Sequence, residues 1–403
     1  MARTTTDVPA RSSPLEVFAV ALRLGLTSFG GPIAHLGYYR EEYVVRRRWL
    51  DERAYLDLVA LCQFLPGPAS SQIGIAVGSM RAGWLGGVLA WVGFTGPSAL
   101  MMLIFAYGVN TFDVSGAGWL RGLMVVAVAV VANAVWGMAR TLAVGRVPAT
   151  IAIAAAVVAL ALPSPVTQVA VIAAGGVLGW RLLGVPGGVA VVLATTPVHG
   201  RRAGVAALVL FAALLVALPL LHRAVDAHAV ALVDANYRAG SLVFGGGHVV
   251  LPLLQSAVVP TGWLTNDRFM AGYGAAQAVP GPLFSFAAYL GAAEAPAPNG
   301  WLGGLLALSA IYLPSFLLLW GVLPFWHQLR ALEAFQAALR GIAAAVVGIL
   351  AAALYSPVWT SAIGAPADFA LALICLGLLV VWRLPPWLVV VVAAAGGQAI
   401  ALG

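Results

Sequence analysis

The chain has 403 residues, of which 62% are hydrophobic and only 9% charged, with a mean hydropathy of +0.97. Soluble domains carry about 25% charged residues, so this composition excludes an ordinary water-soluble enzyme. The 21 basic residues, all arginines scattered between apolar runs, and the 14 acidic residues give a net charge of +7. This pattern excludes lysine chemistry and does not fit a nucleic-acid-binding face. The sequence predicts an all-α, polytopic protein in a lipid bilayer, with no nucleic-acid partner.

Apolar runs long enough to cross a bilayer recur along the chain, since a span needs about 20 residues and at least about 17. The polar tail 1–14 precedes a first run without the signature of a cleaved signal, so this run is interpreted as the first helix. Cys62 and Cys375 lie far apart in apolar segments, so no disulfide, metal site or cofactor is expected. About 13 spans are predicted, at 15–38, 53–79, 83–111, 118–141, 147–163, 165–183, 202–224, 229–258, 267–293, 299–326, 334–356, 367–383 and 385–402.

Six short motifs occur twice in the same order, 214 to 219 residues apart. This order indicates one unit used twice. The first repeat is expected at 15–183 and the second at 229–403, joined by a connecting segment, 184–228, with one extra span at 202–224. The motif pairs are Phe29-Gly30-Gly31 with Phe244-Gly245-Gly246, Trp49-Leu50 with Trp263-Leu264, Gln63-x-x-Pro66-Gly67-Pro68 with Gln277-x-x-Pro280-Gly281-Pro282, Gly83-Trp84-Leu85-Gly86-Gly87 with Gly300-Trp301-Leu302-Gly303-Gly304, Pro97-Ser98 with Pro314-Ser315, and Leu120-Arg121-Gly122 with Leu339-Arg340-Gly341.

The number of spans before the second repeat decides how the two units are oriented. Seven predicted spans precede residue 229, so the second repeat enters the bilayer upside down. Inverted repeats are the architecture of secondary transporters, whose substrate site lies near the midplane where the repeats meet. One re-entrant segment before residue 229 would instead make the repeats parallel.

The duplicated motifs also carry a family resemblance. Ser28-Phe29-Gly30-Gly31-Pro32 and Gln63-Phe64-Leu65-Pro66-Gly67-Pro68, with their second copies, resemble the chromate ion transporter family in its long, two-domain form. The resemblance covers about residues 15–355 and implies a duplicated membrane carrier that exports chromate, an oxyanion similar to sulfate. Two departures, Gly247 in place of Pro32 and Leu283-Phe284-Ser285 in place of Ser70-Ser71, predict that the two half-sites are not equivalent.

The Pro-Gly-Pro motifs predict helices that are broken within the membrane. Proline cannot donate to the helical ladder and disfavours helical geometry at the residue before it. A helix that restarts there offers free N–H groups and a positive dipole end to a tetrahedral dianion. The Phe-Gly-Gly motifs fit unwound backbone and close helix packing equally well. Besides two arginines, the predicted substrate-binding residues are Ser28, Phe29, Gly30, Gly31, Gln63, Pro66, Gly67, Pro68, Ser70, Ser71, Phe244, Gly245, Gly246, Gly247, Gln277, Pro280, Gly281, Pro282 and Ser285.

Those arginines, Arg23 and Arg238, are the predicted charged contacts to the substrate. Each lies six residues before its Phe-Gly-Gly motif. Arginine inside a span costs about 2.5–3.5 kcal/mol on insertion scales, and its guanidinium binds oxyanions through paired hydrogen bonds. Arg238 follows Asp234 by four residues, so a structural ion pair is the alternative there.

Acidic residues are scarce within the spans, so no carboxylate proton relay is visible. His35, His248 and Asp57 are the candidates for proton coupling, because histidine titrates near neutrality, although packing explains a lone histidine as well. A dianion leaving a negative interior gains about 4.6 kcal/mol per 100 mV. Export is therefore predicted to be driven by the membrane potential, with a proton gradient as the rival.

The sequence as a whole predicts chromate efflux across the cytoplasmic membrane, which would confer chromate resistance. A sulfate or other oxyanion transporter or importer is the alternative. An enzyme or a channel fits less well, because the spans lack paired carboxylates, an HExxH motif and filter-like repeats. Chromate is the expected partner, with sulfate as a second substrate and a homodimer as an assembly that the sequence leaves open.

Overall fold

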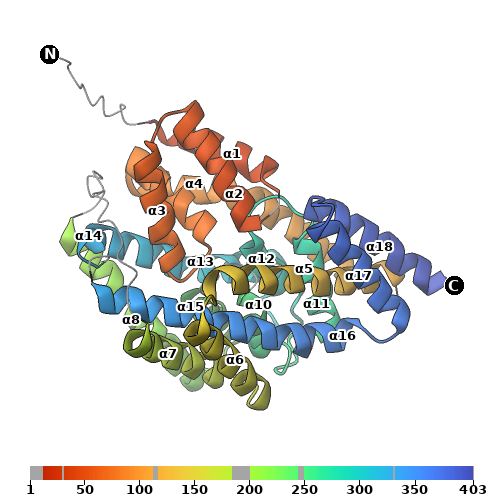
Figure 1. The fold of residues 1–403 in the computed structure, drawn as a ribbon. Coiled ribbons are helices and arrows are strands. Elements are labelled where there is room, and N and C mark those ends of the chain that lie inside the picture. The colour runs from red at the N-terminus through yellow and green to blue at the C-terminus, as the bar shows by residue number, and fades with distance from the viewer. Residues whose placement is uncertain are drawn as a thin grey trace.

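Figure 1 shows the computed structural model of the chain, which describes residues 12–29, 31–111, 117–183, 200–243, 249–329 and 332–402. Every regular element within these ranges is a helix. Ser13, Asp51 and Ser164 cap three of the helices, each accepting a hydrogen bond from a first-turn backbone N–H. The described part of the chain is therefore the all-α, multi-pass membrane protein that the composition predicts.

The helices of the first repeat begin near the start of the described chain and are followed by a single extra helix, α8. The most apolar part of α8 is almost entirely exposed, as expected for a helix that faces lipid. The elements up to this point are α1 (Pro14–Thr27), α2 (Gly31–Tyr39), the π-helix η1 (Arg40–Arg46), α3 (Glu52–Phe64), α4 (Ala69–Thr111), α5 (Gly118–Leu142), α6 (Arg146–Ala161), α7 (Pro165–Leu182) and α8 (Arg201–Ala224).

The second repeat follows the same order with more interruptions. Its elements are α9 (His228–Leu242), α10 (Val250–Val258), α11 (Asn266–Ala276), η3 (Leu283–Ser285), α12 (Phe286–Ala293), α13 (Gly300–Val322), η4 (Leu323–Phe325), α14 (Trp326–Leu329), α15 (Glu333–Ala353), η5 (Leu354–Trp359), α16 (Thr360–Ala362), α17 (Pro366–Val380) and α18 (Pro386–Leu402).

Both predicted helix breaks at the Pro-Gly-Pro motifs are confirmed. α3 ends at Phe64 and α4 begins at Ala69, so the first motif lies outside the helical ladder. In the second repeat α11 ends at Ala276, and the chain becomes helical again at Leu283. Each motif therefore forms a short loop between two helices, because its prolines cannot donate to a continuous ladder.

Some predicted spans have different boundaries in the structure: 15–38 is divided between α1 and α2, and 229–258 between α9 and α10. The segments expected to end at 79 and to restart at 83 are joined in α4, which only kinks at Ala82 and Gly83. At the equivalent place in the second repeat the chain opens into a loop between α12 and α13. Gly83 and Gly300 are equivalent in sequence and have φ angles of 65° and 57°, which glycine adopts without steric cost.

The two repeats interlock through their last helices. α5 of the first repeat packs against α17 and α18 of the second, while α15 of the second packs against α6 and α7 of the first (Figure 1). Small residues permit this close approach: Gly122 lies against Ala393 and Gly397, and Gly341 lies against Gly175 and Gly179. The duplicated Leu-Arg-Gly motif thus marks the point at which each repeat receives two helices of the other.

Several helices are long and apolar enough to cross a bilayer by themselves, and shorter apolar helices lie between them. The count of about 13 spans and the inverted orientation of the repeats remain predictions. Within the described ranges the long apolar helices are Ala69–Thr111, Gly118–Leu142, Arg201–Ala224, Gly300–Phe325 and Glu333–Ala362.

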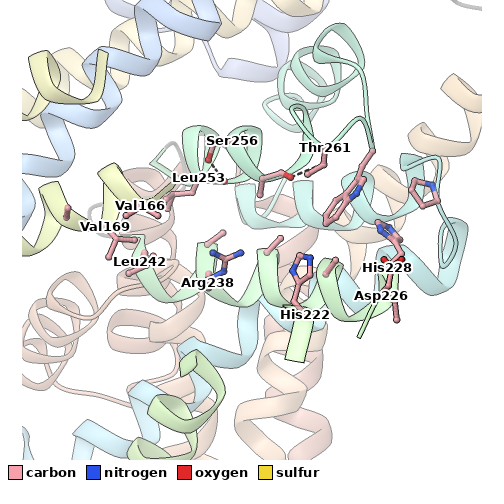
Figure 2. A pocket seen from close by; sticks show the side chains of 18 of the residues that line it. Val166, Val169, His222, Asp226, His228, Arg238, Leu242, Leu253, Ser256 and Thr261 are labelled. Atoms are coloured by element: carbon pink, nitrogen blue, oxygen red, sulfur yellow. Dashed lines mark hydrogen bonds between the residues drawn. The ribbon is translucent and has the colours of Figure 1, made fainter. Parts of the chain in front are cut away.

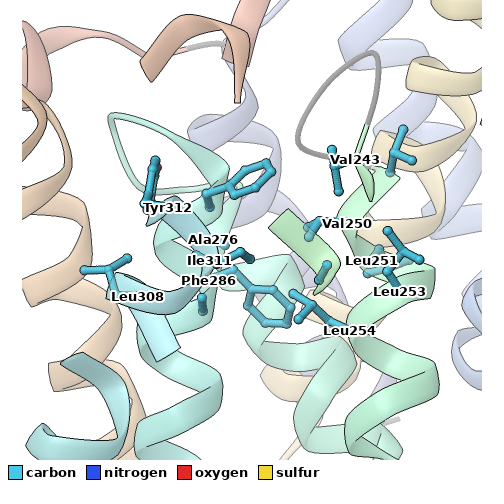
Figure 3. Close-up of a cluster of buried hydrophobic side chains, with 14 of the residues drawn as sticks. Val243, Val250, Leu251, Leu253, Leu254, Ala276, Phe286, Leu308, Ile311 and Tyr312 are labelled. Carbon is cyan, nitrogen blue, oxygen red and sulfur yellow. The ribbon is translucent and has the colours of Figure 1, made fainter. Parts of the chain in front are cut away.

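A buried cluster of apolar and aromatic side chains from α10, α11, α12 and α13 supports the second repeat (Figure 3). Phe286, Ile311 and Tyr312 are fully buried there. Protein interiors are packed as densely as organic crystals, so such a cluster resists deformation. It forms a rigid block from which the second Pro-Gly-Pro loop extends toward the first repeat.

Candidate functional site

The two Pro-Gly-Pro loops each reach across to the other repeat. The backbone N–H of Gly67 donates to the carbonyl of Val243 (2.7 Å), and the N–H of Gly281 donates to the carbonyl of Ser28 (2.9 Å). Ser28 and Val243 are equivalent positions, because they end α1 and α9 and directly precede the two Phe-Gly-Gly motifs. The exchange is therefore reciprocal, and we call the place where these four residues meet the crossing.

Glycine is required at the tip of each loop. Gly67 and Gly281 have φ angles of 123° and 97°, a region that side chains disfavour. A Cβ atom at Gly67 would collide with the Ser315 hydroxyl and the Gln72 amide, and one at Gly281 would press on the Ser98 hydroxyl. The serines of the duplicated Pro-Ser motifs thus belong to the crossing, each beside the loop of the opposite repeat.

Uncharged polar groups of α4 and α13 line the crossing. Ser71 Oγ and Tyr312 OH lie 3.3 Å apart, and both residues are buried. Gln72 Nε2 donates to the carbonyl of Pro66 (2.7 Å), which ties the first loop to the first turn of α4. These hydrogen bonds fix the loop geometry in a region where water cannot compete for them.

Helix α2 covers the crossing from the first repeat. His35 Nε2 donates to the carbonyl of Ser28 (3.2 Å), the acceptor that also receives the Gly281 N–H. His35 and Tyr39 lie one turn apart on α2, and both rings contact Phe94 with centroid distances of 5.3 Å. The conformation of α2 is therefore coupled to the contact between the second loop and the end of α1.

Several buried polar atoms at the crossing have no hydrogen-bond partner within the described residues. An unsatisfied buried polar atom costs about 1–3 kcal/mol, so proteins rarely retain one without a water molecule, an ion or a ligand to serve it. Their side chains are at most 1% exposed, and three of the atoms are hydroxyl oxygens that can donate. The atoms are Ser28 Oγ, His35 Nδ1, Tyr39 OH, Gln72 Oε1 and Ser315 Oγ.

The predicted serines and glutamines divide between the crossing and its surroundings. Ser70 and Ser285 are buried in the first turns after the two loops. Gln63, by contrast, is exposed near the end of α3. Gln277 is half-buried, and its Nε2 makes a long hydrogen bond to the carbonyl of Tyr273 (3.4 Å). The serines, and not the glutamines, are therefore placed to reach a molecule held between the loops.

The predicted arginines lie five residues before the crossing on α1 and α9. Arg23 is exposed, outside the face of α1 that packs on α4. Arg238 is half-exposed, and its Nη2 donates to the buried carboxylate of Asp234 at 2.7 Å. The ion pair that the sequence offered as the alternative for Arg238 is thus present.

Arg238 also lines a cavity of about 790 Å³ beside α7, α9 and α10. Figure 2 shows its apolar wall, which includes Val166 and Leu253, opposite the polar side chains of His222 and His228. The cavity therefore places a cation in a half-open hollow that leads along α9 toward its end at the crossing.

Replacing Arg238 with alanine is expected to lower the thermal stability of the purified protein, because Asp234 would keep a buried charge without its arginine. Asp234→Ala in the same chain should restore most of that stability. If Arg238 contacts the transported ion, the double variant will regain stability without regaining transport. Recovery of both stability and transport in Arg238→Ala/Asp234→Ala would contradict a substrate contact. A thermal melt and an uptake assay on the same preparations distinguish recovery of stability alone from recovery of both stability and transport.

The remaining predicted residues are placed only in part. The Phe29 ring contacts Trp387 of α18 with centroids 6.2 Å apart, and Gly31 begins α2 with a φ of 76°. Of the candidates for proton coupling, His35 is buried at the crossing and Asp57 is half-buried on α3. Their role remains a prediction. Gly30, Phe244, Gly245, Gly246, Gly247 and His248 lie outside the described residues.

Sequence reasoning missed five residues of the crossing. Tyr39, Gln72 and Tyr312 belong to none of the repeated motifs, and the contact of Tyr312 with Ser71 forms only when the two repeats fold together. Ser315 and its counterpart Ser98, by contrast, do belong to a repeated motif. The Pro-Ser pair was recognised as a repeated landmark, and its duplication could have indicated a place at the site.

Comparison with known proteins accounts for both halves of the chain. The family profile described as "Chromate transporter" matches residues 15–180 and 230–398. The "Chromate transport protein" of Pseudomonas aeruginosa is 31% identical over 407 residues, covering 98% of this chain and 93% of the relative. A protein of the same name from Cupriavidus metallidurans is 27% identical, covering 90% of this chain and 86% of the relative. No solved structure matches. The chain therefore belongs to the chromate transporter family.

Proposed function

We propose that the chain exports chromate across the cytoplasmic membrane and so confers chromate resistance. The relatives named chromate transport protein support chromate as the substrate. The observation that carries the proposal is the crossing itself, where reciprocal loop contacts meet buried polar atoms without partners. Such a site fits a transported guest that binds through hydrogen bonds and then leaves.

The chemistry of the crossing suits a tetrahedral oxyanion. A dianion accepts hydrogen bonds and donates none, so it requires hydroxyl and N–H donors. Ser28, Tyr39 and Ser315 each have a buried hydroxyl to offer. The first-turn N–H groups of α4, at Ser70 and Ser71, have no acceptor within the helix and lie at the positive end of its dipole. Neutral donors bind the ion in this scheme.

Arg23 and Arg238 provide positive charge on the approach to the crossing. Each lies five residues, about 7.5 Å along a helix, before the position at which an opposite loop binds. A cation at that distance attracts a dianion without holding it as tightly as a direct bidentate contact. This arrangement favours passage through the site over retention in it.

Alternating access follows from the reciprocal contacts if the repeats are inverted. Two equivalent hydrogen bonds, Gly67 to Val243 and Gly281 to Ser28, then close the site toward opposite faces of the membrane. Release of one contact while the other holds would open the site to one face at a time. The interlocked helices α5 and α15 would transmit the movement between the repeats.

The membrane potential is the proposed driving force, because it favours departure of a dianion from a negative interior. Coupling to a proton gradient is the rival mechanism. Sulfate transport is the alternative function, since sulfate has the same shape and the same demand for hydrogen-bond donors. The variant Arg23→Ala tests whether this exposed arginine serves transport or only anchors α1 in the membrane, because only a transport role lowers uptake at equal protein content.

The test is accumulation of labelled chromate in everted membrane vesicles that contain the protein, with unlabelled sulfate as a competitor. We expect accumulation to follow an imposed potential, positive inside the vesicle, and to fall severalfold in Arg23→Ala at equal protein content. If the vesicles accumulate sulfate and no chromate, the proposed substrate is wrong, while the transport architecture stands.

A further inference from the structure

A buried pair of titratable side chains lies apart from the crossing. His228 Nε2 and Glu294 Oε2 are 2.9 Å apart, and their side chains are 10% and 0% exposed. The imidazole packs edge-on against Trp263, with ring centroids 4.6 Å apart. The second carboxylate oxygen, Oε1, is buried without a partner among the described residues. Because an unpaired charge is costly at this depth, the stability of the surrounding structure depends on the net charge of the pair.

The pair joins two elements of the second repeat. His228 is the first residue of α9, the helix that ends at the crossing. Glu294 caps the end of α12, the helix that follows the second loop. The N–H of Ala295 donates to the carbonyl of Trp263 (2.9 Å), which fixes the turn beneath the imidazole. A change in the pair therefore acts on both elements that present the crossing.

The pair also separates two hollows. His228 lines the cavity of about 790 Å³, and Glu294 lines a second cavity of about 320 Å³. Trp263 lines both cavities. Each member of the pair thus borders a cavity of its own, so a path for a proton to the pair need not pass through the crossing.

The first repeat has no counterpart of this pair. In the register of the motifs His228 corresponds to Ser13, which caps α1. The glycine contacts Gly78–Gly86 and Gly291–Gly303 are equivalent, and they align Glu294 with Arg81. The Arg81 guanidinium donates to Ser12 and lies over Trp49, so the first repeat has a cation where the second has the carboxylate. The pair is therefore not a requirement of the repeated fold. It is an addition to one of two otherwise similar units, as expected for a functional difference between them.

The basic groups around the pair have partners of their own. Burial raises the pKa of the Glu294 carboxyl, in the turn after α12, and the hydrogen bond from His228 opposes that rise. Arg238 and His222 are turned to Asp234, and the Arg268 guanidinium donates to Asn110. The titratable and charged groups that face the pair from neighbouring elements are His222 of α8, Asp226 between α8 and α9, Asp234 and Arg238 of α9, Arg268 of α11 and Tyr107 of α4.

We propose that His228 and Glu294 form a proton-binding site that is linked to transport. With one proton added to neutral imidazole and carboxylate, the pair is an internally neutral ion pair that holds the start of α9 against the turn after α12. Loss of that proton leaves a net negative charge in the buried site and weakens the hold. Transport is then faster at higher pH, because the elements around the crossing separate more easily.

The inference rests on the proposed function, since chromate uptake is its first readout. Uptake is measured from pH 6 to pH 8 at a fixed potential in wild type, Glu294→Gln, His228→Gln and the matched control Glu333→Gln, which removes an exposed carboxylate in the first turn of α15. Titration of chromate affects all four proteins alike, so the ratio of variant to wild-type rate isolates the pair. We expect the wild-type rate relative to Glu294→Gln to rise severalfold with pH, by at most about tenfold per unit for one proton. Glu333→Gln should follow wild type.

A second readout does not depend on chromate. The melting temperature of the purified protein in detergent should fall from pH 6 to pH 8 in wild type, because the proton is bound more tightly by the folded pair than by the unfolded chain. Glu294→Gln should lose that dependence, and Glu333→Gln should keep it. If wild type and Glu294→Gln share one pH profile in both assays, the proton-binding site is overturned. If the melting shift is present but no chromate moves, the site stands and the proposed function falls.

Discussion

Alanine at Gly67 is expected to reduce chromate uptake by at least about tenfold while the protein still inserts into the membrane. The Cα of Gly67 has a φ of 123°, and a methyl group there would collide with the Ser315 hydroxyl and the Gln72 amide. Strain of this kind costs about 1–3 kcal/mol, and each 1.4 kcal/mol is a factor of about ten in an equilibrium. The loop must shift, which removes its N–H from the Val243 carbonyl and displaces the unpartnered serine.

Gly83→Ala is the matched control for this prediction. Gly83 also has a positive φ, 65°, but a Cβ atom there would meet open space. The control therefore carries backbone strain without a collision at the crossing. Uptake is measured in everted vesicles and divided by the amount of inserted protein. Equal losses in Gly67→Ala and Gly83→Ala would show that strain alone matters and would contradict a specific role for the loop tip.

Gly281→Ala extends the argument to the second repeat. Its Cβ would lie 3.1 Å from the Ser98 hydroxyl and 3.2 Å from the Phe94 carbonyl oxygen, so these neighbours must yield by only a few tenths of an ångström. A smaller loss than in Gly67→Ala is therefore the expected order of effects. This order reflects the inequivalence of the half-sites that the sequence departures predict.

The duplication and the helix breaks were predictable because they are local. Proline removes a donor wherever it stands, and repeated motifs are visible without any folding. The crossing was only half predictable. The sequence indicates which loops are special, but the hydrogen bonds from Gly67 to Val243 and from Gly281 to Ser28 join residues of different repeats. No pattern along the chain encodes that exchange.

The arginines show where single-sequence reasoning about membrane charge is limited. The cost of burying Arg23 in a span indicates a function only if the side chain faces the protein interior. Val17, Val20, Ala21 and Leu24 form the buried face of α1, and Arg23 lies outside it. The pair of His228 and Glu294 was missed for the opposite reason, because its members lie near predicted span ends, where polar residues are common.

Ser315→Ala is the variant that most directly tests the crossing as a binding site. The Ser315 hydroxyl is fully buried and has no partner within the described residues, so its removal costs no hydrogen bond in the empty protein. Stability should stay unchanged or rise slightly, because an unsatisfied group is deleted. If the hydroxyl donates to chromate, the variant loses a hydrogen bond to a charged group, worth about 1.5–3 kcal/mol. The expected result is a KM raised by about tenfold or more.

Ser79→Ala, on α4, provides the opposite case. Ser79 is equally buried, but its Oγ accepts a hydrogen bond from Trp320 Nε1 (3.0 Å). Its loss removes an acceptor from a buried indole and should lower the melting temperature, whereas the KM for chromate should stay near that of wild type. The two variants thus predict opposite pairs of results, measured by uptake kinetics and thermal melts. A destabilised Ser315→Ala with an unchanged KM would mean that its hydroxyl serves the fold and that chromate binds elsewhere.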